Sequence, residues 1–290
     1  MIGIHLNHEL DCSERRRLVF NGDLLLYSRN AATAALADHA ISLASEAFAP
    51  MDPQFAQEEL SVAAFIERAG PLKSRFTNDL RTKELVRDVL VAFGCDLDET
   101  YFDVPRLRLV PHGDYLSSGV SYAYKAHRDI WYASPTAQVN WWLPAFAVTT
   151  ERAMSFFPEY WSKAVPNSSS EFDYDEWCRV GRQLATSQVD KDTRKHPLPA
   201  DPISTESELR IASTKGDVIM FSAAHLHATA ANRSGRTRFS IDFRTLNRSD
   251  IEQGRGAPNV DSRPSGSTIG DFIRARDFAP IQIPSAWQQP

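Results

Sequence analysis

A histidine and an aspartate stand one residue apart in this chain, as His127-Arg128-Asp129, at the end of a strand-like run. Alternate residues of a strand point to the same face, so the imidazole of His127 and the carboxylate of Asp129 are expected on one side. Both groups bind divalent metals. With one further histidine from another strand, they would occupy three adjacent coordination positions of a metal and leave the opposite three open.

A third ligand is expected from a later strand-like block, which contains His225 and His227. Arg238 follows on the last long strand, beyond a turn at 232–236, so we expect His227 and Arg238 on adjacent antiparallel strands. Arginine presents a planar pair of N–H donors that suits a carboxylate, and Ser240 shares the face of Arg238 and can add a hydroxyl. This arrangement favours His227 as the metal ligand and leaves His225 as a structural residue.

A second His-x-Asp pair, His112-Gly113-Asp114, offers the same two ligand types. Pro111 and Gly113 mark a turn there, whereas a strand over 118–126 leads directly to His127. We therefore predict the ligands at 127 and 129. The competing interpretation is that the later histidines are core residues with satisfied hydrogen bonds.

The segments 104–150 and 208–246 carry the strand patterns that would position these side chains. Strands are expected over 106–110, 118–126, 137–143, 218–222 and 237–245. The stretch 151–207, with a helix expected near 173–188, is predicted to be an insertion that acts as a lid, as long loops in compact enzymes often do. The tail, 250–290, is expected to wrap the surface.

The first hundred residues predict mainly helices, over 31–48, 61–69 and 82–93. Before them, the segments 15–20 and 24–27 flank an Asn-Gly turn and predict a β-hairpin. The fold class is therefore mainly β with helical additions, in a single catalytic domain over 1–290.

The composition excludes several classes of partner. The net charge is −5 and the pI about 5.9, so no basic field is present to attract nucleic acid or an anionic membrane. The chain has no apolar run of about 18 residues, and residues 1–10 lack a signal-peptide pattern. The three cysteines, Cys12, Cys95 and Cys178, are odd in number and widely spaced, which predicts reduced thiols in a cytoplasmic protein.

The pattern His127-x-Asp129, then His227-x4-Asn232-x5-Arg238-x-Ser240, resembles the Fe(II)/2-oxoglutarate-dependent dioxygenases, specifically their phytanoyl-CoA dioxygenase-like branch. A Gly-Asp strand start at 216–217 is a shared feature, and the resemblance covers roughly 104–246. The branch usually carries a Pro-Gly-Ser-His run after the first ligands. Here only the proline is kept, at 158, so this chain departs from the branch around the substrate pocket.

The resemblance implies a double-stranded β-helix, that is, a cupin-like jelly roll, with N-terminal helices and a helical or loop insertion. It implies Fe(II) bound by His127, Asp129 and His227, with 2-oxoglutarate chelating the metal and paired with Arg238. Reaction with O2 would convert 2-oxoglutarate to succinate and CO2 and would oxidise a substrate, usually by hydroxylation. A small-molecule substrate from secondary metabolism is expected, and a homodimer is left open.

Further polar and aromatic residues are expected around the same cavity. Gln138, Asn140 and Trp142 share one face of their strand, and the two amides are candidates for binding the cosubstrate. Trp131 and Tyr132 follow the first ligands and are expected at the mouth of the cavity. The predicted substrate contacts are Trp131, Tyr132, Trp142 and Tyr124.

Two other functions use the same metal ligands in different ways. Related halogenases replace the carboxylate ligand with glycine or alanine, so Asp129 disfavours halogenation. A cupin-like metal protein that is not an oxygenase, such as an isomerase or a binding module, would have no need for Arg238.

Overall fold

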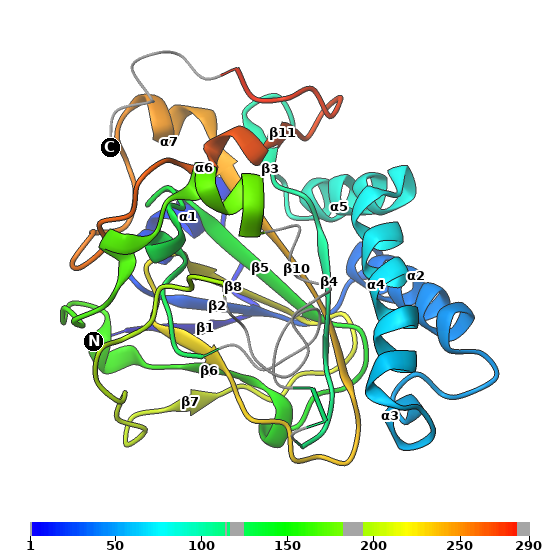
Figure 1. The fold of residues 1–290 in the computed structure, drawn as a ribbon. Coiled ribbons are helices and arrows are strands. Elements are labelled where there is room, and N and C mark those ends of the chain that lie inside the picture. Colours follow the sequence, from blue (N-terminus) through cyan, green and yellow to red (C-terminus); the bar gives the residue numbers. More distant parts are fainter. Residues whose placement is uncertain (1, 114, 117–124, 182–193, 283–290) are drawn as a thin grey trace.

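The structure is a computed structural model that describes residues 2–113, 115–116, 125–181 and 194–282 (Figure 1). Two β-sheets form the centre of the molecule. Helices α2 (Ala31–Phe48) and α4 (Val62–Asn78) contact strands of the larger sheet, and α5 (Leu80–Ala92) packs on α2. The helices therefore cover the outer face of that sheet, which leaves its inner face for a site.

The larger sheet contains eight strands among the described residues. Within them, β1 and β2 pair in parallel and all other neighbours are antiparallel. The strand order is β1 (Ile4–Leu6), β2 (Leu24–Tyr27), β8 (Val218–Ser222), β5 (Val139–Pro144), β10 (Arg238–Asn247), β3 (Thr100–Phe102) and β11 (Ile273–Arg274), with β4 (Arg106–Val110) also on β10.

The smaller sheet has the order β7 (Leu209–Arg210), β6 (Met154–Phe156), β9 (His227–Thr229) in the part of the chain that the structure describes. An antiparallel bridge between His127 and His227 adds the segment at His127 to its edge. From β4 to β10 the chain crosses repeatedly between the sheets, with β4, β5, β8 and β10 in the larger one. This order is that of a double-stranded β-helix, so the predicted jelly-roll core is confirmed.

One expectation about this core was wrong. His227 and Arg238 do not lie on adjacent antiparallel strands, because β9 belongs to the smaller sheet and β10 to the larger. The chain changes sheets between them, so the two side chains approach the interior from facing sheets.

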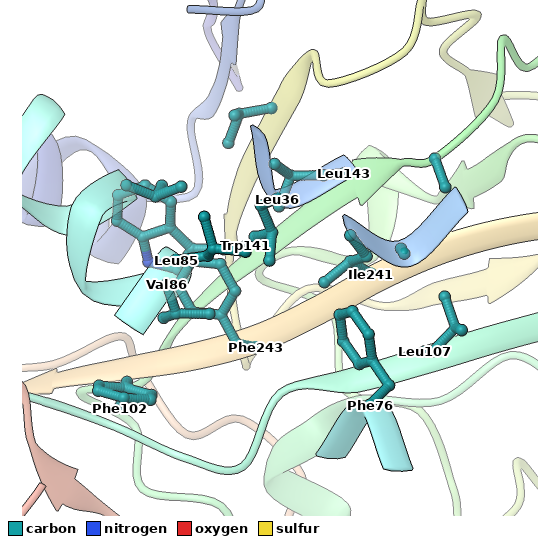
Figure 2. Packing of buried hydrophobic residues seen from close by; sticks show 14 of the residues in the cluster. Leu36, Phe76, Leu85, Val86, Phe102, Leu107, Trp141, Leu143, Ile241 and Phe243 are labelled. Carbon is teal, nitrogen blue, oxygen red and sulfur yellow. The ribbon is translucent and has the colours of Figure 1, made fainter. Parts of the chain in front are cut away.

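Strand β10 shows how alternating side chains divide the molecule into a core and a site. Phe243 stacks on Trp141 with ring centroids 5.3 Å apart, in an apolar core that includes Leu85 and Val86 of α5 (Figure 2). The other face of β10 is polar and points into the space between the sheets. Its residues are Arg238, Ser240, Asp242 and Arg244.

The three long helices follow their sequence signals closely. Asn30 and Thr33 form a reciprocal capping box at the start of α2, and Ser61 caps α4 through the backbone N–H of Ala64. Helix α4 continues past Pro71, although the prediction ended it at 69, because its apolar face is carried on at helical spacing by Leu72 and Phe76.

The segment 15–20 is helical and not the first strand of a hairpin, so that prediction was wrong. Helix α1 (Cys12–Phe20) starts at Asp11, whose carboxylate accepts from the N–H of Glu14 while the Glu14 side chain accepts from the N–H of Asp11. This capping box outweighs the short apolar run at 18–20. Arg15, the first of three consecutive arginines at 15–17, is buried and donates to the carbonyl of Phe93.

The stretch predicted as an insertion, 151–207, contributes β6 to the smaller sheet before it leaves the core. Most of the strand expected over 118–126 lies outside the described residues, and its last two positions, 125 and 126, are not in a strand. The second half of the helix expected near 173–188 also lies outside the described residues. Every helix that the structure describes is too short or too polar to span a membrane. The shorter helical elements are α3 (Ala56–Glu59), α6 (Tyr174–Glu176), α7 (Arg248–Glu252), the π-helix Trp177–Gly181, and the 3-10 helices Asp129–Tyr132, Thr150–Arg152, Pro158–Tyr160, Ser169–Glu171 and Thr268–Asp271.

Candidate metal centre

The two histidines and the aspartate predicted as ligands lie together inside the jelly roll. One ligand atom from each lies within 4.8 Å of the others, and all three residues are buried. Oδ1 of Asp129 is 3.4 Å from Nε2 of His127 and 3.8 Å from Nε2 of His227. Three donors converge on one point, which is the arrangement that a divalent metal requires.

Local backbone geometry explains why His127 and Asp129 share a side. Arg128, between them, is extended (φ −108°, ψ 141°), so its neighbours point the same way and its own side chain points oppositely. Arg128 is fully buried and donates to Asp261 at 3.0 Å and to the carbonyl of Tyr160 at 2.6 Å. It anchors the segment on the side away from the ligands.

Both imidazoles are oriented by backbone carbonyls. Nδ1 of His127 lies 2.8 Å from the carbonyl oxygen of Lys125, and Nδ1 of His227 lies 2.9 Å from that of His225. A carbonyl only accepts hydrogen bonds, so Nδ1 of each ring carries a proton and Nε2 is the atom left to face a metal. Metal-binding histidines are commonly held in this way.

The carboxylate of Asp129 is held from its other oxygen. Oδ2 accepts from Nδ2 of Asn140 at 2.7 Å and from Nε2 of Gln138 at 3.3 Å, and Nε of Arg244 lies 3.9 Å away. Burial alone would raise the pKa of Asp129, but the contact with His127 and the charge of Arg244 outweigh it and hold this pKa well below its ordinary value. Asp129 is therefore ionised, with Oδ1 facing the histidines.

His227 is neutral, as a metal-bound imidazole must be. Burial, followed by the neighbouring His127, lowers the pKa of His227 to about 4. One anionic carboxylate and two neutral imidazoles form a donor set that fits a divalent first-row metal such as Fe(II). His225 does not join this set, because its Nε2 lies 2.7 Å from the carbonyl of Gly22 and its buried ring packs on Trp161 at 4.7 Å.

A cavity of about 890 Å³ adjoins the ligands, within the size range of small-molecule sites. Side chains from both sheets line it, including Asn140, Trp142 and Arg238 of the larger sheet and Met154 and Thr229 of the smaller one. Helix α4 contributes Lys73 to the lining. Burial, and then the charge of Arg108, lower the pKa of Lys73 to about 7.

Arg238 and Ser240 lie next to each other on the inner face of β10. Arg238 is almost completely buried, with its guanidinium carbon 5.8 Å from the ring centre of Trp142 and Nη1 donating to the carbonyl of Arg152 at 3.2 Å. Oγ of Ser240 and Nε1 of Trp142 are buried and lack a hydrogen-bond partner among the described residues. Buried donors of this kind normally have a partner, so both atoms suit a bound polar group.

Several predicted residues take other positions. Trp131 does not lie at the mouth of the cavity: it is fully buried in a separate apolar cluster and donates from Nε1 to Asp261 at 2.7 Å. The 3-10 helix that begins at Asp129 turns it away. Gln138 is fully buried and donates to Asp129 and Asn140, so it supports a ligand and does not line the cavity. Tyr124 lies outside the described residues.

Tyr132 does line the cavity, and it belongs to an aromatic wall that the sequence revealed only in part. Its ring meets His127 edge-on at 5.4 Å and Phe172 at 5.2 Å, and its hydroxyl lies 3.2 Å from Nδ1 of His196. No sequence motif marks His196, because it reaches Tyr132 through the tertiary fold alone.

Other charged residues around the cavity form ion pairs. Arg108 binds Asp242 at 2.6 Å, and Arg244 binds Asp103 at 2.8 Å. His112, from the rival ligand pair, accepts from the N–H of Gly235 at 3.0 Å and so braces a turn. Its partner in that motif, Asp114, lies outside the described residues.

Comparisons with known proteins show weak structural similarity. No family model and no curated protein matches this sequence. Solved structures with partial similarity include EvdO2 from Micromonospora carbonacea var. aurantiaca complexed with 2-oxoglutarate, at 13% identity and a TM-score of 0.39 over 60% of this chain. The match spans 62% of EvdO2, less than two thirds of its length.

Two further structures match over more of this chain. The epimerase SnoN in complex with Fe3+, alpha ketoglutarate and nogalamycin RO is 14% identical, with a TM-score of 0.42, over 81% of this chain and 83% of its own. The non-heme monooxygenase ThoJ is 13% identical, with a TM-score of 0.41, over 76% and 71%. Structural similarity at this level carries no functional argument, so a function has to rest on the residues of the site itself.

Proposed function

We propose that this protein is an Fe(II)/2-oxoglutarate-dependent oxygenase that oxidises a small molecule and converts 2-oxoglutarate and O2 to succinate and CO2. The observation that carries the proposal is the convergence of two Nε2 atoms and Oδ1 of Asp129 on one point. Each ligand is already oriented by a hydrogen bond on its far side. Buried ligands that are each oriented by a hydrogen bond indicate a functional site and not only core packing.

His127, Asp129 and His227 would hold the metal. When bound there, Fe(II) supplies O2 activation coupled to decarboxylation of a 2-oxo acid, for which a three-residue ligand set leaves room. Asn140 and Gln138 keep the carboxylate of Asp129 aimed at the metal position. The backbone carbonyls beneath the two imidazoles keep their lone pairs aimed at the same point.

Arg238 would bind the distal carboxylate of 2-oxoglutarate. A guanidinium pairs with a carboxylate through two parallel N–H donors, and exclusion of water strengthens that pairing. Arg238 is buried on the wall of the cavity. The hydroxyl of Ser240 and Nε1 of Trp142 are buried on the same side and would complete the hydrogen bonding of that carboxylate.

The aromatic wall would bind the substrate. Tyr132, Phe172 and Trp177 line the cavity in succession, and Phe172 contacts both of the other rings. Such a surface suits a largely apolar or ring-bearing metabolite, as found in secondary metabolism. Tyr132 contacts the ligand His127, so a substrate that packs on this wall would lie close to the metal.

The test is anaerobic reconstitution with Fe(II) and 2-oxoglutarate. We expect a metal-to-ligand absorption band when 2-oxoglutarate is added, and slow succinate formation when O2 is admitted. His227→Ala should abolish both, because it removes one of three ligands. His5→Ala, which alters a histidine of β1 paired with Asp23 at 2.8 Å, is the matched control and should keep both.

The outcomes separate the competing functions. Metal binding without a 2-oxoglutarate-dependent band would indicate an isomerase or a binding module on the same fold. Halide incorporation would indicate a halogenase, which the hydrogen-bonded Asp129 opposes. Succinate formation by the His227→Ala variant would contradict the proposal.

A further inference from the structure

Two cysteines that are far apart in sequence meet behind the larger sheet. Cys12 is the first residue of α1, and Cys95 follows the end of α5. Their Sγ atoms are 3.6 Å apart, although 83 positions separate them in the chain. Both thiols are free and partly exposed, and the third cysteine, Cys178, lies in the π-helix Trp177–Gly181.

The pair lies in a cationic environment. Nη1 of Arg16 lies 3.0 Å from Sγ of Cys12, and Arg16 is itself fixed by an ion pair with the buried Asp250. The neighbouring Arg15 is held by the carbonyls of Leu10 and Phe93. Arginines so anchored present fixed positive charge to a thiolate.

The two thiols differ in acidity. The hydrogen bond with Cys95 lowers the pKa of Cys12 to about 6, helped by the charges of Arg16 and Arg15 and opposed by burial. The same hydrogen bond, together with burial, raises the pKa of Cys95 well above its ordinary value. The thiolate therefore forms more readily at Cys12 than at Cys95, which makes Cys12 the nucleophile of the pair.

A small hollow gives access to the pair. It measures about 20 Å³ and is lined by both cysteines, both arginines and Trp141. That is enough room for one water-sized molecule. The hollow therefore suits a compact oxidant such as hydrogen peroxide.

We propose that Cys12 and Cys95 form a redox-active dithiol that a hydroperoxide converts to a reversible disulfide. Sγ of Cys12 attacks a peroxide oxygen, the O–O bond breaks, and Cys12 becomes a sulfenic acid as hydroxide leaves. Sγ of Cys95 then attacks the Cys12 sulfur, the S–S bond forms, the S–O bond breaks, and water leaves. In total, two thiols and one H2O2 give one disulfide and two waters, and a dithiol reductant reverses the change.

The disulfide would join the start of α1 to the end of α5 and close the long loop that contains α2 and α4. Restricting such a loop in the unfolded chain stabilises the folded state. The pair uses none of the proposed metal ligands, so this inference stands independently of the proposed function.

The experiment uses the full chain, reduced and freed of reductant, and treats it with one equivalent of hydrogen peroxide. The number of thiols titrated in denaturant should fall from three to one, and the intact mass should fall by about 2 Da. Dithiothreitol should restore three thiols. Non-reducing peptide mapping should link Cys12 to Cys95. The melting temperature should rise by roughly 5 °C on oxidation.

Matched variants assign the reaction to this pair. Cys178→Ser should still lose two thiols, whereas Cys95→Ser should show no intramolecular disulfide and no rise in melting temperature. Persistence of three thiols in the wild type, a disulfide that includes Cys178, or sulfinic acid at Cys12 in place of a disulfide would each overturn the proposal. The wild-type measurements decide the question even if a variant fails to fold.

Discussion

Asn140 donates a 2.7 Å hydrogen bond from Nδ2 to Oδ2 of Asp129, and this bond turns the other oxygen of the carboxylate toward the two histidines. Gln138 supports the same geometry, because its Nε2 donates to Oδ1 of Asn140 at 2.8 Å as well as to Asp129. Two buried amides thus prepare the charged ligand before any metal binds.

Asn140→Ala should weaken metal binding by roughly 10- to 100-fold, the usual cost of losing a residue that orients a ligand. Calorimetric titration of the protein with Co(II), a surrogate for Fe(II), measures this directly. Asn78→Ala, which removes an exposed amide on α4, is the control. Equal affinities in the two variants would show that the amide does not position Asp129.

Arg238→Ala should raise the concentration of 2-oxoglutarate needed to form half of the absorption band by about 10-fold or more, because a charge-assisted pairing is lost. Pyruvate has no distal carboxylate, so its binding should be unchanged. Arg238→Lys keeps the positive charge but lacks the planar pair of donors. The 2-oxoglutarate concentration that it needs for half of the band should therefore lie between those of the wild type and Arg238→Ala. Arg276→Ala, an exposed arginine paired with Asp98, serves as the control. If pyruvate and 2-oxoglutarate weaken together, Arg238 acts on the metal site and not on the distal carboxylate.

Trp131→Phe should lower the free energy of unfolding by about 1–3 kcal/mol, since the buried hydrogen bond from Nε1 to Asp261 is lost. Urea denaturation measures the change. The 2-oxoglutarate absorption band should be unaltered, because this tryptophan packs outside the cavity. A weaker band with an unchanged free energy of unfolding would instead place Trp131 in the cavity beside the metal ligands.

Alkylation of Cys12 should follow a titration with its midpoint near pH 6, because its pKa is lowered from an ordinary value of 9.0. A lowered thiol pKa means that the reactive thiolate is already present at neutral pH and is lost as the pH falls below about 6. Iodoacetamide labelling rates at this site, read by peptide mass spectrometry, provide the measurement. Arg16→Gln should move the midpoint upward. A native-state midpoint equal to that of the urea-unfolded chain would contradict the assignment.

Much of the fold could be predicted from local patterns. The alternation along 238–244 placed Arg238 and Ser240 opposite Phe239, because the side-chain period of a strand is two whatever the tertiary fold. Helix α2 was predictable over its full length because both its apolar spacing and its N-cap are local. Helix α1 was not, since its short apolar run suits a strand as well as a helix, and the capping box at Asp11 was the deciding signal.

The sequence by itself determined the chemistry available to this protein: a His-x-Asp pair, a distal histidine and an arginine on a polar strand face, in an order typical of one ligand set. Tertiary structure alone decided which groups meet. His227 and Arg238 reach one cavity from different sheets, and Trp131 packs in a core beside Asp261. His196 contacts Tyr132, and Cys12 contacts Cys95. The physical reason is that residue type and local period are written within a few positions of the chain, whereas contacts between distant segments depend on how the whole core packs.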